Sequence, residues 1–202
     1  MSEDFNSQRR QKLYQSSARA LGAIWERRWQ ILKMGMYSDI DGSVADFILK
    51  MEDMLLRWEG IHIPERGKLR YVAISPLSSG IITRSYECQT ALFDREPFVE
   101  ENPLCFYWTP KFIYQDMEAD VQDFREMVSR DMIRLREDEV EEIRRKYALC
   151  HAYTTMLFLD GIFKEIKKLP FWKRIAGRDV KVLYGTYMEK MVEIGKEEAA
   201  AE

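Results

Sequence analysis

Basic and aromatic side chains alternate in one segment near the C-terminal end of the sequence, 164–178. Cations in such a pattern can bind the phosphates of a nucleic acid or of an anionic surface, and aromatic rings can stack on bases. Alternatively, the lysines complement the dipole at the end of a helix while the aromatic rings enter the core. A charge run is more often a solvated face, which favours the structural interpretation. The candidate nucleic-acid or anion-binding residues are Lys167, Lys168, Trp172, Lys173 and Arg174.

A second candidate site combines an aromatic-rich segment with a predicted strand that precedes it. Five aromatic residues fall within the nine positions 106–114. Aromatic rings with a few polar tips line small-molecule pockets, but they also build ordinary cores, and the core is the more frequent outcome. If a pocket is present, the residues expected to line it are Arg84, Tyr86, Tyr107 and Trp108.

Residues of the kinds that catalyse reactions or bind metals occur in spacings that do not support a site. Cys150 and His151 are neighbours in a predicted helix, so their side chains point about 100° apart and do not easily form a thiolate–imidazole pair. Cys150 also falls on an apolar stripe, where we expect a buried thiol. Glu59 and His62 have the spacing of a di-iron bundle motif, but the sequence has one copy where such sites need two. The sequence thus predicts no catalytic residue, no metal and no cofactor, and it favours a protein that is not an enzyme.

Composition describes an ordinary globular protein. The 202 residues are 46% hydrophobic and carry a formal net charge of −3, which does not indicate a nucleic-acid or membrane partner. Residues 1–33 form a basic end, with seven Lys/Arg against three acids. Three cysteines without a C-x-x-C pair indicate reduced thiols, and no apolar run approaches the ~20 residues of a membrane span. We therefore expect a cytoplasmic protein with no membrane span.

Apolar periodicity predicts the elements that must position these residues. A stripe on the first helix contains Tyr14, Ala18, Leu21, Trp25 and Leu32. A break near 137 is preferred to one kinked helix, because the apolar stripe shifts there by one residue. Segment 180–194 fits either a strand or a helix, and the tail from about 196 is expected to fray. The predicted helices are about 8–33, 43–59, 115–136 and 138–167, and the predicted strands are about 69–75, 82–93 and 105–108.

These elements predict an α+β fold in which helices surround a small antiparallel sheet, with 1–202 as a single globular domain. Several amphipathic helices without a catalytic signature favour a non-enzymatic intracellular binding or interaction protein. It would be a homo-oligomer or a subunit that docks through its helices onto a protein partner. Two alternatives stay open: a nucleic-acid-associated regulatory protein using the basic helix 8–33 and segment 164–178, and a small-ligand sensor or enzyme with a pocket near 84–86 and 106–114.

Overall fold

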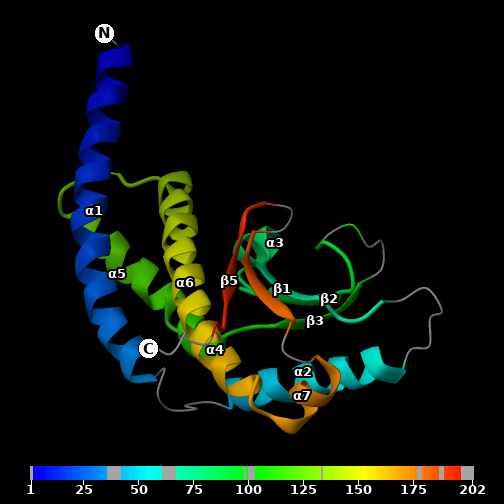
Figure 1. Cartoon of the computed structure of the whole chain (residues 1–202). Helices are drawn as coiled ribbons and strands as arrows, with labels where there is room; N and C mark the ends of the chain where they lie inside the picture. The colour runs from blue at the N-terminus through cyan, green and yellow to red at the C-terminus, as the bar shows by residue number, and fades with distance from the viewer. Residues whose placement is uncertain are drawn as a thin grey trace, which may run out of the picture. The chain divides into compact units, whose positions relative to one another are not determined.

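The computed structural model describes residues 2–35, 42–60, 67–97, 99, 103–132, 134–176, 179–186 and 189–196. It confirms the α+β class, with helices around a small sheet (Figure 1). The chain forms two compact units, which are described separately. Unit 1 comprises Met1–Ser38 and Phe112–His151, and unit 2 comprises Asp39–Lys111 and Ala152–Glu202. The organisation as a single domain stays a prediction, and the expected fraying lies largely outside the described residues.

Unit 1 is helical. The long helix α1, Ser2–Gly35, packs against α5, Met117–Ser129, and α6, Glu137–Ile166, contributes its first half. The short helix α4, Lys111–Tyr114, leads into α5. On α1 the buried residues recur about every fourth position, which is the spacing of one helix face: Ser16, Ala20, Ile24, Arg28 and Leu32.

The predicted break near residue 137 is confirmed, although the first helix is shorter than 115–136. α5 ends at Ser129 and α6 begins at Glu137. The backbone N–H of Arg136 donates a hydrogen bond of 2.9 Å to the carboxylate of Glu139, three residues on. A carboxylate in this position satisfies an amide that the first turn leaves without a helical acceptor. Local capping therefore gives α6 its own start.

Unit 2 contains a five-stranded sheet in the order β3-β2-β1-β4-β5. The three predicted strands pair antiparallel, as expected. The sheet as a whole is mixed, because β1 also pairs in parallel with β4, with Tyr71 opposite Lys181. Segment 180–194, left open between strand and helix, supplies two strands. Both strands are short, so periodicity alone could not distinguish a strand from a helix in this segment. The strands are β1 Tyr71–Pro76, β2 Cys88–Phe93, β3 Leu104–Trp108, β4 Lys181–Gly185 and β5 Met191–Ile194.

The strand predicted at 82–93 begins only at Cys88, because its first residues belong to a helix and to the turn that follows it. Helix α3, Ser78–Thr83, lies between β1 and β2 and takes up the first residues of the predicted strand. Arg84 and Tyr86 then have positive φ angles of 63° and 52°, which take the backbone out of an extended path. A Cβ atom on Gly80 would lie 3.0 Å from the backbone nitrogen of Glu87, so the chain passes close to itself here. β2 begins only after this reversal.

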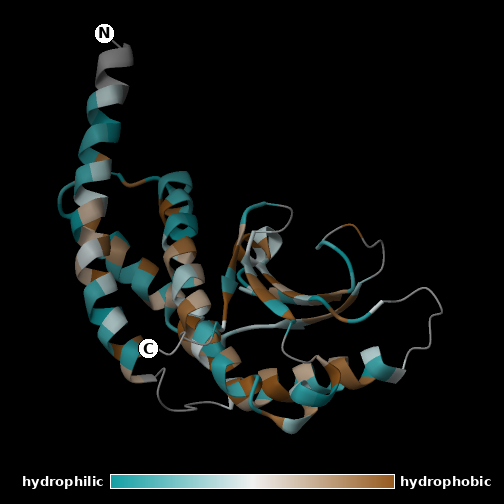
Figure 2. Cartoon of the chain, in the orientation of Figure 1, coloured by the Kyte–Doolittle hydropathy of each residue, from teal (hydrophilic) through white to brown (hydrophobic). Residues whose placement is uncertain are grey.

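Aromatic rings fill the core between the sheet of unit 2 and its helices. Helix α2, Ser43–Gly60, and helix α7, Pro170–Ile175, lie on one side of the sheet (Figure 1). Phe47 of α2 packs on Trp108 with ring centroids 4.9 Å apart, and on Phe163 of α6 at 5.7 Å. Hydrophobic and hydrophilic residues alternate along α2, as its amphipathic sequence predicts (Figure 2).

Candidate functional site: a groove between α1 and α6

The candidate site lies in unit 1, at one end of the seam along which α1 and α6 run side by side. Further along this seam, aromatic packing closes the space. The ring of Trp25 lies 6.1 Å from that of Tyr147 and 5.4 Å from that of His151, measured between centroids. His151 is fully buried, and this burial lowers the pKa of its imidazole to about 4. The closed end is therefore dry, and the histidine is neutral there at neutral pH.

A charged cluster stabilises the closed end. The guanidinium of Arg28 donates two hydrogen bonds to the carboxylate of Asp120, and the hydroxyl of Tyr147 donates a third, of 2.8 Å. Arg28 also forms an ion pair with Asp116. Burial and the hydrogen bond to Asp120 raise the pKa of Tyr147, and the hydrogen bonds that Arg28 donates to Asp120 raise the pKa of Arg28. Arg28, Asp120 and Tyr147 are buried and hydrogen-bonded to one another, so the cluster holds the three helices together.

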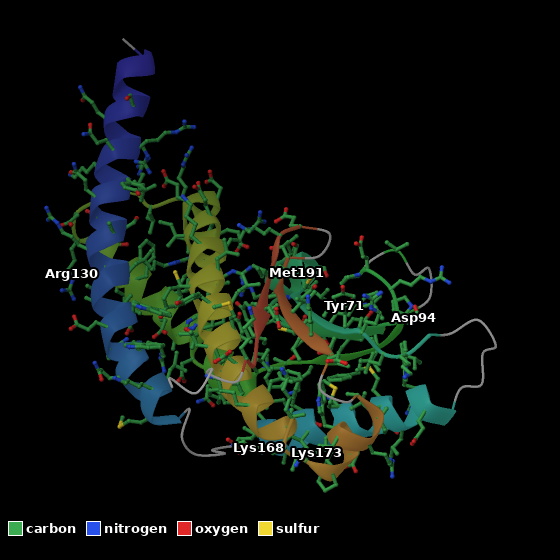
Figure 3. All side chains as sticks on the ribbon, in the orientation of Figure 1. Tyr71, Asp94, Arg130, Lys168, Lys173 and Met191 are labelled. Atoms are coloured by element: carbon green, nitrogen blue, oxygen red, sulfur yellow. The ribbon has the colours of Figure 1, made fainter. Side chains whose placement is uncertain are left out.

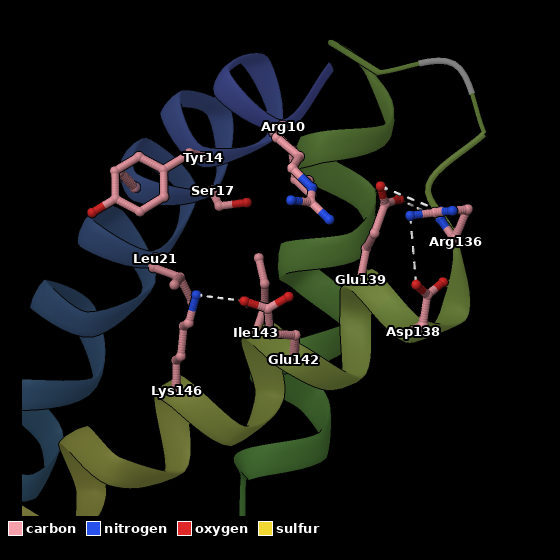
Figure 4. A pocket seen from close by; sticks show the side chains of 12 residues that line it. Arg10, Tyr14, Ser17, Leu21, Arg136, Asp138, Glu139, Glu142, Ile143 and Lys146 are labelled. Atoms are coloured by element: carbon pink, nitrogen blue, oxygen red, sulfur yellow. Dashed lines mark hydrogen bonds and ion pairs between the residues drawn. The ribbon is translucent and has the colours of Figure 1, made fainter. Parts of the chain in front are cut away.

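The other end of the seam is open, although large as well as small residues of α1 line it. Ser17 and Ala18 lie where Trp25 lies further along, and a groove of about 590 Å³ remains between the two helices (Figure 4). This volume is in the range of protein binding sites, about 300–1,000 Å³. Its lining residues come from both helices and the loop before α6: Arg10, Leu13, Tyr14, Ser17, Ala18, Leu21, Arg136, Asp138, Glu139, Glu142, Ile143 and Lys146.

The groove is lined by apolar and charged residues together, with Leu13, Leu21 and Ile143 among the apolar ones. The hydroxyl oxygen of Ser17 is buried and has no hydrogen-bond partner among the described residues. Figure 4 shows this hydroxyl and the guanidinium of Arg10 turned into the space between the helices. A buried polar atom in a groove indicates where a polar group of an occupant would bind.

Ion pairs balance most of the charge around the groove. The Nη2 atom of Arg9 lies 2.8 Å from Oε2 of Glu139, and Lys146 lies 2.7 Å from Glu142. Burial raises the pKa of Glu139, but hydrogen bonds from Arg9 and from the Arg136 amide lower it overall. The hydrogen bond from Lys146 lowers the pKa of Glu142, and the charge of Arg10 adds to this effect. Both carboxylates are therefore ionised at neutral pH.

The four residues predicted to line a pocket lie in unit 2, in different environments. Trp108 is buried, donates a hydrogen bond of 3.2 Å to the carbonyl of Ser43 and belongs to the core. Tyr86 is buried at the reversal before β2, whereas Arg84 is exposed and Tyr107 is half-exposed on β3. None of the four lines the groove of unit 1 or the cavity of unit 2 described next. Their role in ligand binding stays a prediction.

The predicted anion-binding residues are divided between core and surface. Trp172 is 1% exposed and packs on Phe163, as the structural interpretation of the segment expects. Lys167 donates a hydrogen bond of 2.8 Å to the carbonyl of Gly195. Lys168 and Lys173 lie at the surface of unit 2 (Figure 3). Arg174 lines a second cavity, of about 810 Å³, with Lys68 and Arg70, but the acids Glu59 and Asp179 line it too.

The residues that line the groove were predicted to form a helix and its core, not a binding site. Tyr14, Ala18 and Leu21 belong to the predicted apolar stripe of α1, and such a stripe ordinarily indicates core. The available signal was a run of small residues in α1, where six of the eight positions 16–23 are Ser, Ala or Gly. Cys150, in contrast, was expected to be buried and is exposed.

No protein-family model, no curated protein and no solved structure matches this chain. Among the residues that the structure describes, no group of three His, Cys, Asp or Glu side chains is placed to hold a metal ion. No helix in the described part of the chain is long and apolar enough to cross a membrane.

Proposed function

We propose that this protein is a non-enzymatic binding or interaction protein that accepts a helix of a protein partner in the groove between α1 and α6. One observation carries the proposal: the seam between two amphipathic helices is packed at one end and open at the other. Helix-in-groove recognition places the apolar face of a partner helix in an apolar groove, and Leu13, Leu21 and Ile143 supply apolar lining here. An intracellular, cytoplasmic location belongs to the same proposal and rests on the composition of the sequence.

Exposed apolar side chains beside the groove support docking. Tyr14 is 72% exposed at its edge, and Leu149 is 59% exposed one turn beyond Lys146 on the same face of α6. Tyrosine is among the residues that most often contribute strongly to protein interfaces. The hydroxyl of Ser17 offers a hydrogen-bonding position that an occupant would fill.

The placement of titratable groups favours docking over catalysis. Asp120, Tyr147 and His151 have the chemistry for acid–base work, but all three are buried. Asp120 already accepts hydrogen bonds from Arg28 and Tyr147. A catalytic group must reach the substrate within hydrogen-bond distance, and these groups lie where no substrate enters.

The nucleic-acid alternative has weaker support. Arg174, Lys68 and Arg70 gather around one cavity of unit 2. However, Arg174 lies 3.3 Å from the carboxylate of Glu59, which offsets its charge. Steep salt dependence of binding to DNA or RNA would favour this alternative.

Site-specific photo-crosslinking in living cells tests the docking proposal. A benzophenone amino acid replaces Tyr14 at the groove, and a matched variant carries it in place of the exposed Arg130 at the end of α5 (Figure 3). We expect light to produce discrete protein adducts from position 14 and none of the same mass from position 130. Absence of an adduct from position 14, or identical adducts from both positions, would overturn the proposal.

A further inference from the structure

We infer that the helix accepted by the groove carries one Asp or Glu, flanked on each side by an apolar residue one helical turn away. The inference rests on the proposed function and assigns the chemistry of the partner at the same groove. In the complex, the carboxylate of the partner helix lies between the guanidinium of Arg10 and the hydroxyl of Ser17. Its apolar neighbours contact the apolar lining of the groove, Leu13, Leu21 and Ile143.

The hydroxyl of Ser17 fixes the position of a polar group in the occupant. Ser17 is 5% exposed, and its hydroxyl oxygen has no hydrogen-bond partner among the described residues. Leu13 and Leu21 stand four residues before and after it, so the three side chains share one face of α1. A serine hydroxyl can donate one hydrogen bond. An occupant that brings an acceptor to this height, between two apolar contacts, satisfies it.

Arg10 determines the charge of that acceptor. Among the described residues it forms no ion pair, whereas its guanidinium is turned into the space between the helices (Figure 4). The hydrogen bond from Lys146 lowers the pKa of Glu142, and the charge of Arg10 lowers it further, so Arg10 acts on the α6 side of the groove. The other charged lining residues are ion-paired within the chain: Arg136, Asp138, Glu139, Glu142 and Lys146. The charge left to complement is therefore one positive charge, on α1.

A carboxylate suits these two donors better than an amide or a phosphate does. Its two oxygens can accept from the guanidinium and from the hydroxyl at the same time. Hydrogen bonds between charged groups are shorter and stronger than those of a neutral amide. A phosphate would bring up to about two negative charges close to Glu139 and Glu142, where like charges repel. One unpaired cation thus selects one carboxylate.

The apolar lining matches the spacing of a helix. Leu13 and Leu21 are half-buried, and each lies one turn from Ser17, about 6 Å along the axis of α1. A helix that runs along this face presents side chains every three or four residues, at nearly the same interval. Its residues one turn before and after the carboxylate therefore reach the two leucines. Tyr14, which is 72% exposed, offers further apolar surface beside them.

Three matched peptides test the charge assignment. Each is a hydrocarbon-stapled helix of about 15 residues, with leucine one turn before and one turn after a central residue that is Glu, Gln or Lys. Fluorescence anisotropy of the labelled peptides measures their binding to the full chain. We expect the Glu peptide to bind about tenfold more tightly than the Gln peptide, because its hydrogen bonds are charge-assisted. The Lys peptide should bind most weakly.

Variants of Arg10 identify the residue that reads the charge. Arg10→Gln should remove the preference for Glu over Gln, and Arg10→Glu should make the Lys peptide the tightest of the three. Lys12→Glu is the matched control, because Lys12 is an exposed base of α1 that does not line the groove. This variant should keep the wild-type order of affinities. Circular dichroism checks that all three variants keep their helices.

Ser17 provides a test in which stability and binding separate. Ser17→Ala should weaken the Glu peptide about fivefold through the loss of one hydrogen bond. It should not lower the melting temperature, because the lost hydroxyl has no partner among the described residues and alanine is the better helix former. Ser16→Ala is the control with the opposite outcome. It removes a hydrogen bond of 2.8 Å to Asp131, so it should lower the melting temperature and leave peptide binding unchanged.

Equal binding of the three peptides, or a preference for Glu that survives Arg10→Gln, would overturn the assignment of an acidic helix. The same holds if none of the peptides binds. The crosslink from position 14 distinguishes each of these failures from failure of the docking proposal. A discrete protein adduct leaves the docking proposal standing, and its crosslinked segment should contain an acid with apolar residues one turn to either side. Absence of any adduct overturns both.

Discussion

The guanidinium of Arg28 and the carboxylate of Asp120 face each other through two hydrogen bonds, 2.9 Å from Nε to Oδ2 and 2.8 Å from Nη2 to Oδ1. Arg28 belongs to α1 and Asp120 to α5, so the pair connects two of the helices of unit 1. The planar fork of arginine matches a carboxylate in this bidentate geometry, which fixes both position and orientation. Tyr147 adds a contact from α6, so one carboxylate connects three helices.

Removing this carboxylate should strongly destabilise the fold. Asp120→Ala leaves the buried guanidinium of Arg28 with only its contact to Asp116, and breaking a buried pair in this way costs about 3–5 kcal/mol. The free energy of unfolding is measured by urea titration at neutral pH. As a matched control, Asp123→Ala removes an exposed partner of Arg27 and should cost less than about 1 kcal/mol. Equal losses in the two variants would contradict the role given to Asp120.

Acidification should destabilise the protein through His151. The unfolded imidazole titrates near pH 6.5, whereas burial lowers the pKa of the folded group to about 4. Between these values the unfolded chain binds a proton that the folded chain does not, so stability falls as the pH decreases from about 6.5 to about 4. Urea titrations between pH 7 and 4.5 should show a shallower decline for His151→Phe than for the wild type. An unchanged decline would mean that His151 is not buried and neutral.

Trp172 should behave as a core residue although it stands in a basic segment. Its ring is buried against Phe163, so Trp172→Ala should cost about 3–5 kcal/mol and clearly lower the melting temperature. The exposed neighbour Lys173 provides the control, because Lys173→Ala should change stability by less than about 0.5 kcal/mol. Calorimetry of both variants makes the comparison. Wild-type stability of Trp172→Ala would instead support the segment as a recognition surface.

Sequence periodicity predicted the four longest helices, α1, α2, α5 and α6, because each repeats its apolar spacing over several turns, but it missed the short helices α3, α4 and α7. Six or more apolar residues recur every three or four positions along α2 and along α6. A strand repeats every two residues and does not fit that spacing. The strands were harder, since β4 and β5 are short and their apolar residues also fit a helix. The parallel partner of β1 could not be predicted at all, because a pairing of Tyr71 with Lys181 leaves no local signal in the sequence.

The groove was not predicted for a different reason. A cavity depends on which side chains fail to fill a space between two helices, and periodicity reports only which side faces inward. Ala18 and Ile143 were each assigned to an apolar stripe, but the distance between the stripes is a tertiary property. Cys150 is exposed for the same reason. Periodicity places it on an apolar stripe of α6, but it does not predict how far other helices cover that stripe.

The three thiols should react in an order that follows their exposure. Cys105 and Cys150 are exposed, whereas Cys88 is buried and its burial raises the pKa to about 12. Burial also raises the pKa of Cys150, so Cys105 should react first with a thiol reagent at pH 8. Mass spectrometry of tryptic peptides over time measures the order. Cys88 should react only in denaturant, and early labelling of Cys88 would contradict the position of β2 in the sheet.

The parallel pairing of β1 with β4 has a consequence for the newly made chain. While the ribosome is still adding residues before Lys181, β1 can pair with β2 but not with its other neighbour. One row of its backbone amides and carbonyls then stays open, and open strand edges readily join edges of other chains. A nascent or truncated chain that stops before β4 should therefore aggregate, and a chaperone that shields extended segments should be needed until β4 has left the ribosome and can pair with β1.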